Sequence, residues 1–138
     1  MKIYDCFTDG SFNLETQKAS WAFIIIDGDK IIHQNKGIIE NPDWNTGRQI
    51  AGECFAVVNA LEWAAQNNAK LNVNYDYTGV YFWVCDIWGQ NRWKANREYT
   101  AKYRKKVFDL SRNLEKMTKV KAHAGVAFNE YVDKLAKT

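Results

Sequence analysis

The chain has 138 residues, of which 46% are hydrophobic and 25% charged, and its formal net charge is +3. This length predicts one globular domain spanning residues 1–138. No apolar run approaches the about 18 residues of a membrane helix, which excludes a membrane-spanning protein. The first residues also lack the apolar core of a signal peptide, which predicts a cytoplasmic location.

Three strands are predicted at the start of the chain, over residues 3–9, 20–26 and 30–37. Asp27-Gly28-Asp29 joins the second strand to the third and is a strong hairpin signal, so the three strands form an antiparallel meander. Residues 41–45, which include the only proline, then break the chain. A long helix follows at about 48–67, because its apolar positions recur at helical spacing.

The second half of the chain alternates between strands and helices. The predicted elements are a strand at 71–75, a short helix near 79–85, a tryptophan-rich loop, a helix at about 98–114, a strand at 118–122 and a terminal helix at about 128–137. The order βββαβααβα predicts an α/β fold, in which a five-stranded mixed sheet combines the antiparallel meander with parallel strands and is flanked by helices. If strands one and four are neighbours, residues at their ends face a common crevice.

The cysteines constrain the chemistry. Cys6, Cys54 and Cys85 are odd in number, far apart and embedded in apolar stretches. This pattern argues against a disulfide framework and against a zinc cluster. The three are therefore predicted to be reduced thiols in the core.

Four carboxylates stand where solvated charges are not expected. Asp9 closes the first strand, Glu53 interrupts the apolar stripe of the long helix, Asp76 follows the fourth strand, and Asp133 lies in the terminal helix. A buried carboxylate is costly unless it is paired, protonated or bound to metal. A converging group of hard oxygen ligands suits Mg²⁺ or Mn²⁺. Together the four predict a metal site.

Each of these acids taken alone is better explained as an ordinary helix cap or salt-bridged carboxylate, and only their combination favours a metal site. Asp5 shares its strand parity with Asp9, so alternation does not settle which of them faces the site. Asp9 is preferred because Gly10 and Ser11 leave room for a ligand beside it. In the terminal helix, Glu130 shares a face with Asp133, and Asn129 is the expected N-cap that places both acids in the first turn.

Positive charge is concentrated between residues 92 and 121. This segment holds 11 Lys and Arg against three acids, a local excess of eight positive charges, so the remainder of the chain is net negative. A basic flank beside an acidic cluster fits an enzyme that holds cations and a polyanion together. Taken alone, the charge run also fits an ordinary solvated helix face.

Short motifs follow one another along the chain in a specific order. They are Phe7-Thr8-Asp9-Gly10-Ser11, Ala51-Gly52-Glu53, Tyr75-Asp76, Lys121-Ala122-His123-Ala124-Gly125, Asn129-Glu130 and Asp133-Lys134-Leu135-Ala136. In this order and in these strand and helix contexts, they resemble ribonuclease H type 1 over nearly the whole chain. The middle segment 75–100, with its tryptophans, is most similar to the bacterial branch in which this domain often follows a small hybrid-binding module.

The resemblance implies a ribonuclease H-like fold and an endoribonuclease that cuts the RNA strand of RNA/DNA hybrids with two Mg²⁺ ions, for which Mn²⁺ is a substitute. The products would carry 3′-hydroxyl and 5′-phosphate ends. The matching catalytic and metal-binding residues are Asp9, Glu53, Asp76 and Asp133. His123 matches a histidine assigned to proton transfer or product release, and Glu130 an acid near the metal. A monomer without an obligatory protein partner is expected.

Two groups of residues are predicted to contact the hybrid. Ser11, Phe12, Asn13 and Gln49 would read the RNA strand, which alone offers 2′-hydroxyls. Trp88, Trp93, Lys94, Asn96 and Thr100 would line a channel for the DNA strand. Trp21, Trp63 and Trp83 are predicted in the core, whereas for Trp88 and Trp93 core packing and substrate contact remain equal alternatives.

Two rival functions remain open at this stage. A related nuclease or polynucleotidyl transferase acting on DNA would share the fold, but the His123-Ala124-Gly125 loop with Asn129-Glu130 belongs to the ribonuclease H pattern. A non-catalytic nucleic-acid-binding module is the second rival. Retention of all four carboxylates argues against it, because such a module would gain stability by losing clustered acids.

Overall fold

A computed structural model describes residues 1–120 and 127–138. Its five strands form one sheet in the order β3-β2-β1-β4-β5. The strands are β1 (Lys2–Asn13), β2 (Lys18–Asp27), β3 (Lys30–Ile38), β4 (Ala69–Tyr75) and β5 (Leu114–Lys119). β1, β2 and β3 pair antiparallel, whereas β1, β4 and β5 pair parallel, so the predicted mixed sheet is confirmed. The predicted site residue His123 lies outside the described residues.

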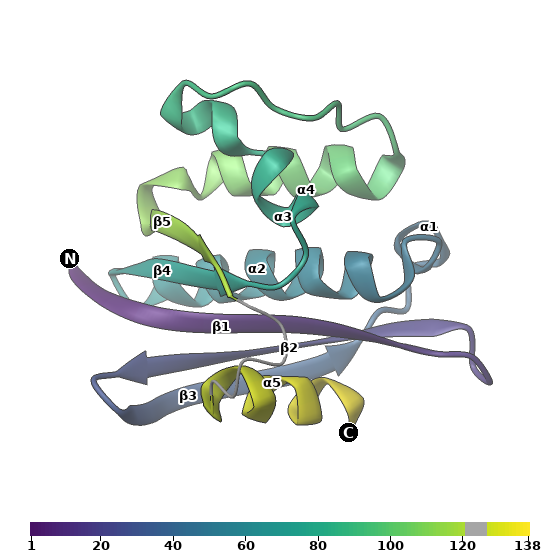
Figure 1. Cartoon of the computed structure of the whole chain (residues 1–138), viewed down its shortest axis with the longest axis horizontal. Helices are drawn as coiled ribbons and strands as arrows, with labels where there is room; N and C mark the ends of the chain where they lie inside the picture. The colour runs from purple at the N-terminus through teal and green to yellow at the C-terminus, as the bar shows by residue number, and fades with distance from the viewer. Residues whose placement is uncertain (121–126) are drawn as a thin grey trace.

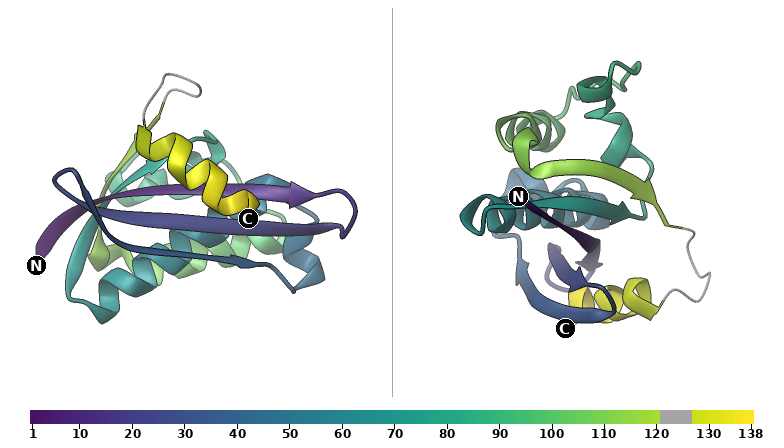
Figure 2. Two further views of the ribbon diagram at one scale, coloured as in Figure 1. Left: turned by 90° about the horizontal axis from the view of Figure 1, so that it is seen from below. Right: turned by 90° about the vertical axis from the view of Figure 1, so that its left-hand side faces the viewer.

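The helices cover the two faces of the sheet unequally (Figure 1). They are α1 (Pro42–Asn45), α2 (Arg48–Gln66), α3 (Gly79–Phe82), η1 (Cys85–Trp88), α4 (Glu98–Asp109), η2 (Ser111–Asn113) and α5 (Ala127–Lys137). α2 and α4 lie on one side of the sheet, and α5 lies across β1 and β2 on the other (Figure 2). None of the described helices is long and apolar enough to cross a membrane.

The hydrophobic core is divided by the sheet into two clusters, one on each face. The larger cluster joins β1, β2 and β4 to α2 and α4, and it contains the buried rings of Trp21, Trp44 and Trp83. Trp63 is half-buried at its edge. The smaller cluster lies under α5, where Val132 and Ala136 pack on Ile24. The three cysteines are free and buried, which confirms their prediction as core thiols.

The boundaries of the last helix and strand before α5 were predicted wrongly. α4 ends at Asp109 rather than near 114, and β5 occupies 114–119 rather than 118–122. The helix stops because the 3₁₀ turn η2 follows it at once. The Asn113 side chain then donates a hydrogen bond to the Ala69 carbonyl at 2.9 Å, which fixes the start of β5 beside the start of β4.

Two further local predictions are corrected. β1 does not end at Asp9 but runs on to Asn13, because its hairpin pairing with β2 continues to Asn13 opposite Lys18. Its parallel pairing with β4 stops at Phe7, so Asp9 lies where β1 and β4 separate. Asn129 is not an N-cap, since it lies inside α5; of the two acids, only Glu130 is in the first turn.

Candidate active site

The first and second acids are brought together by a close main-chain contact between β1 and α2. A Cβ atom built on Gly10 would lie 2.2 Å from the Gln49 carbonyl oxygen, and one built on Gly52 would lie 2.2 Å from that of Ser20. Such distances leave no room for a side chain at either position. The backbones therefore touch directly. Because Asp9 precedes Gly10 and Glu53 follows Gly52, this contact places the two acids beside each other.

Glu53 holds the end of β4 against α2. Its side chain is 3% exposed, and its two carboxylate oxygens accept hydrogen bonds from the backbone N–H groups of Asp76 at 2.7 Å and Tyr77 at 2.9 Å. The hydroxyl of Thr8, itself fully buried, lies 3.3 Å from the same carboxylate. Glu53 thus fixes the main chain of Asp76, and we refer to this arrangement as the Glu53 clamp.

Asp9 faces α5, where it meets the fourth acid. Its carboxyl group is within hydrogen-bonding reach of Asp133, and it also accepts a bond from the Gly10 N–H at 2.8 Å. Burial, the hydrogen bond to Asp133 and the charge of Glu53 together raise the pKa of Asp9 to about 8. Burial likewise raises the pKa of Glu53 to about 7, although the amide donors of the clamp act in the opposite direction. Because the carboxylates of this centre are desolvated and repel one another when ionised, Asp9 and Glu53 keep their protons to a higher pH than ordinary carboxyl groups.

The four predicted acids meet in pairs rather than as a preformed cage. Asp9 interacts with Asp133 and Glu53, and Glu53 interacts with Asp76. Within residues 1–120 and 127–138, no three His, Cys, Asp or Glu side chains gather closely enough to hold a metal ion together as they stand. The fit to a cation rests instead on donor chemistry, because hard carboxylates with raised pKa values gain most from divalent Mg²⁺ or Mn²⁺.

The remaining acids of the prediction lie at the rim. Glu130 is exposed in the first turn of α5. Asp133 is half-buried and also pairs with Lys137 one turn along at 3.1 Å. Asp5, the alternative to Asp9, is exposed and is approached by the Asn72 side chain at 3.4 Å. Asp9 rather than Asp5 therefore faces the other acids.

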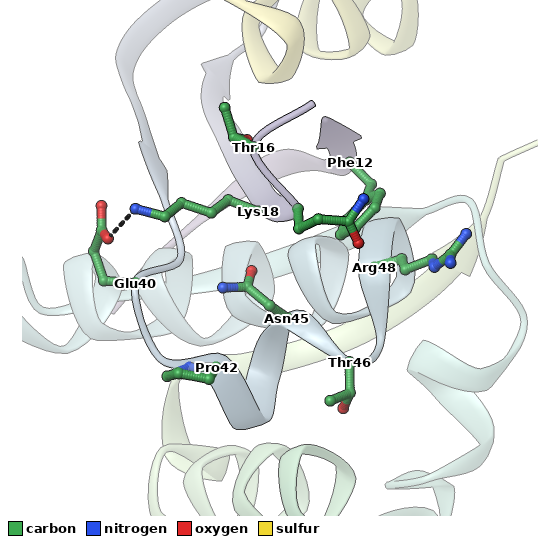
Figure 3. A pocket seen from close by; sticks show the side chains of 9 residues that line it. Phe12, Thr16, Lys18, Glu40, Pro42, Asn45, Thr46 and Arg48 are labelled. Atoms are coloured by element: carbon green, nitrogen blue, oxygen red, sulfur yellow. Dashed lines mark hydrogen bonds and ion pairs between the residues drawn. The ribbon is translucent and has the colours of Figure 1, made fainter. Parts of the chain in front are cut away.

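The residues predicted to read the RNA strand lie next to this centre. Ser11 and Phe12 are half-buried and Asn13 and Gln49 are exposed, and all four flank the Gly10–Gly52 contact. Phe12 faces α2, where the Arg48 guanidinium lies 5.1 Å from the centroid of its ring. Figure 3 shows both residues at a cavity of about 460 Å³ between the hairpin end, α1 and the start of α2.

The predicted DNA channel corresponds to the segment between α3 and α4. Trp88 is 39% exposed and stacks on Tyr81, and Trp93 is 43% exposed and stacks on Phe82. Lys94 and Asn96 are exposed in the same segment. Thr100 is different, because it is 1% exposed and its hydroxyl bonds with the backbone of Arg97 at the start of α4. Thr100 is therefore a helix-capping residue, which corrects its prediction as a channel residue.

Sequence reasoning missed two participants. Thr8 was noticed only as part of a motif, although a hydroxyl in an apolar strand with the parity of Cys6 indicates a buried donor. Arg48 has a left-handed backbone with φ of 53° at the start of α2. No feature of the sequence signals this conformation, which a non-glycine residue adopts rarely.

Because these rings are predicted to stack on sugars of the DNA strand, replacing Trp88 or Trp93 with alanine is expected to raise the KM for an RNA/DNA hybrid about tenfold, equivalent to about 1.4 kcal/mol of lost contact. Stability should fall little, because both rings are half-exposed. Steady-state kinetics and urea unfolding measure the two effects. Trp21→Ala is the contrasting variant, with an expected loss of about 3–5 kcal/mol in stability. Unchanged KM with a large stability loss would assign Trp88 and Trp93 to the core.

Comparisons with known proteins agree with this geometry. A family model described as RNase H matches residues 1–138. A protein named Ribonuclease H from Neorickettsia sennetsu is 27% identical over 148 aligned positions, which cover 99% of this chain and 92% of the relative. RNase H1 from the halophilic archaeon Halobacterium salinarum has a similar structure, with a TM-score of 0.70 and 19% identity over 98% of this chain and 95% of that one. The N-terminal RNase H domain of a Mycobacterium tuberculosis protein gives a TM-score of 0.73 and 19% identity over 99% and 92% of the two chains.

Proposed function

Because the chain belongs to the ribonuclease H family, we propose that it is an endoribonuclease that hydrolyses the RNA strand of RNA/DNA hybrids. The observation that carries this proposal is the meeting of Asp9 with Asp133 and Glu53 beside a β1 segment of small and polar residues. Asp9 and Asp133 repel each other when ionised, and a divalent cation that binds phosphate would neutralise this repulsion.

Asp9, Glu53, Asp76 and Asp133 are proposed to hold two Mg²⁺ ions, with Mn²⁺ as a substitute. Bound there, the ions would supply an activated water and stabilise the charge on the leaving oxygen. The protein would hold these ligands in place, because the Glu53 clamp fixes the main chain of Asp76 and the Gly10–Gly52 contact fixes that of Asp9. Ser11, Asn13 and Gln49 would orient the RNA strand across these acids.

The reaction needs no protein nucleophile. Attack of water on phosphorus forms one P–O bond and breaks the bond to the 3′ oxygen, which takes up a proton. The products carry 3′-hydroxyl and 5′-phosphate ends. Glu130, exposed one turn before Asp133, is proposed to assist near the metal, and His123 to assist proton transfer or product release.

The experiment that tests this function offers the protein four labelled substrates: an RNA/DNA hybrid, duplex DNA, duplex RNA and single strands. Each is incubated with Mg²⁺ or with EDTA. The expected result is cleavage of the RNA strand of the hybrid in Mg²⁺ alone. Cleavage that persists in EDTA would refute the metal-dependent mechanism. Cleavage of duplex DNA would favour a DNA nuclease instead, and no cleavage of any substrate would favour a non-catalytic binding module.

A further inference from the structure

On the α5 side of the sheet, two adjoining hollows lie along the β1–β2 hairpin. The first, of about 380 Å³, is lined by the polar and charged residues Ser11, Asn13, Thr16, Lys18, Ser20, Lys137 and Thr138 and by the apolar residues Phe12, Ile38 and Ala136. A second hollow of about 310 Å³ continues toward β3 and adds Lys36 and Glu40. The two hollows share Ser20, Ile38, Ala136 and Thr138, and we call them together the hairpin groove.

The hairpin groove adjoins the catalytic acids, because its lining begins two residues after Asp9 on β1 and three residues after Asp133 on α5. Asp9, Ser11 and Asn13 alternate along β1 and share one face, since Gly10 between them faces α2. On the opposite wall, Lys137 lies one turn beyond Asp133 and pairs with it. A strand whose phosphate lies at Asp9 and Asp133 therefore continues into this groove.

The charges of the hairpin groove fit a polyanion. Lys18, Lys36 and Lys137 line it against one carboxylate, that of Glu40. Lys18 pairs with Glu40 at 2.6 Å, as Figure 3 also shows, but the two side chains are 42% and 73% exposed. Exposed pairs of this kind are weak, so a phosphate can replace Glu40 as the partner of Lys18 at little cost. The Lys36 ammonium group donates a hydrogen bond to the neutral hydroxyl of Thr138 at 2.8 Å.

We propose that the hairpin groove binds the sugar-phosphate backbone of the strand being cut, beyond the cleavage site, and so lengthens the hybrid that the protein recognises. This inference rests on the proposed function. The phosphates would pair with Lys18 and Lys36, and the hydroxyl and amide groups along β1 and β2 match the polar edge of a ribose backbone. Specific bases are not read there, so the contribution is independent of sequence.

The test compares two double variants that lose the same charge. Lys18→Gln with Lys36→Gln removes the groove lysines. Lys2→Gln with Lys30→Gln is the matched control, because Lys2 also forms an exposed pair, with Asp27 at 2.9 Å, at the opposite end of the hairpin strands. Cleavage kinetics in Mg²⁺ are measured between about 50 and 200 mM salt. The groove variant should show a KM raised several-fold, an unchanged kcat, and a salt slope of log KM reduced by about one to two. The control should match the wild type.

A second measurement separates the groove from general electrostatics. The substrate is a duplex with one short cleavable RNA segment, extended on one side or on the other. In the wild type, extension on one side should lower KM, and the groove variant should lose that gain while keeping any gain from the other side. The double variant Lys18→Arg with Lys36→Arg, which keeps both positive charges, should again show the lower KM for the extended substrate. An unchanged salt slope and length dependence would overturn the inference and leave the proposed function intact, whereas failure of the wild type to cut any hybrid would refute both.

Discussion

Replacing Asp9 with asparagine is expected to abolish cleavage of the hybrid and, in the absence of metal, to make the protein more stable. The first effect follows because Asp9 lies between Asp133 and Glu53, where cations would provide several kcal/mol of transition-state stabilisation, equivalent to at least about a thousandfold in kcat. The second follows because a neutral amide relieves repulsion among the acids. Single-turnover cleavage and thermal unfolding in EDTA measure the two effects.

The stability that Asp9→Asn gains over the wild type should increase as the pH rises from about 4 to about 8. The pKa of Asp9 is 3.8 in an ordinary setting and about 8 in the folded protein. Between these values the folded protein keeps a proton that the unfolded chain has released. Stability of the wild type therefore falls as the pH rises through this interval, and the variant escapes that loss. Its advantage should be small near pH 4 and largest near pH 8.

Asp5→Asn is the matched control for both effects. Asp5 lies on the same strand and the same side of the sheet, but it is exposed and away from the other acids. The Asp5→Asn protein should keep the activity of the wild type and the same change of stability with pH. If Asp9→Asn destabilised the metal-free protein, or still cut the hybrid, the four acids would not form the repulsive centre described above.

Gly52→Ala is expected to destabilise the protein by about 3 kcal/mol and to lower kcat about a hundredfold. The added methyl group would lie 2.2 Å from the Ser20 carbonyl, so β1 and β2 must move away from α2. Glu53 is the next residue, and displacement of a catalytic group by about 1 Å is enough for a rate loss of this size. Urea unfolding and steady-state kinetics measure the two quantities.

Whether Gly52→Ala destabilises or stabilises the protein distinguishes a steric clash at the β1–α2 contact from the helix propensity of alanine. Alanine is favoured over glycine inside a helix by about 1 kcal/mol, so propensity alone would make Gly52→Ala stabilising. Ala65→Gly, at an exposed position of the same helix, gives the size of the propensity term without a contact. A stabilised, fully active Gly52→Ala protein would show that the two backbones do not meet.

The sequence could predict the order of elements along the chain and the mixed sheet, because the apolar runs of the first strands, the Asp27-Gly28-Asp29 hairpin and the apolar stripe of α2 are strong local signals. The end of α4 was predicted too late, because residues 110–113 do not interrupt the helical pattern and the start of β5 depends on the distant bond from Asn113 to Ala69. The length of β1 was underestimated for a similar reason, since its last residues are strand only through pairing with β2.

The four acids could be predicted by their placement, but their arrangement could not. That both Glu53 oxygens accept main-chain bonds from the residues after β4 is a property of the assembled sheet and helix. The burial of Thr100 was likewise invisible, because a threonine in a polar segment fits a surface contact and a helix cap equally well. Trp88 and Trp93 could not be assigned from the sequence, because each ring stacks on an aromatic neighbour and is nevertheless 39% or 43% exposed.

The contact between Gly10 and Gly52 also bears on how freely this protein can change during evolution. The two halves of the centre are joined there through main-chain atoms, whose spacing does not depend on neighbouring side chains. Residues around the crossing can therefore be exchanged without moving Asp9 relative to Glu53, provided that the two glycines remain. Two positions without a functional group of their own thus set the spacing of the acids.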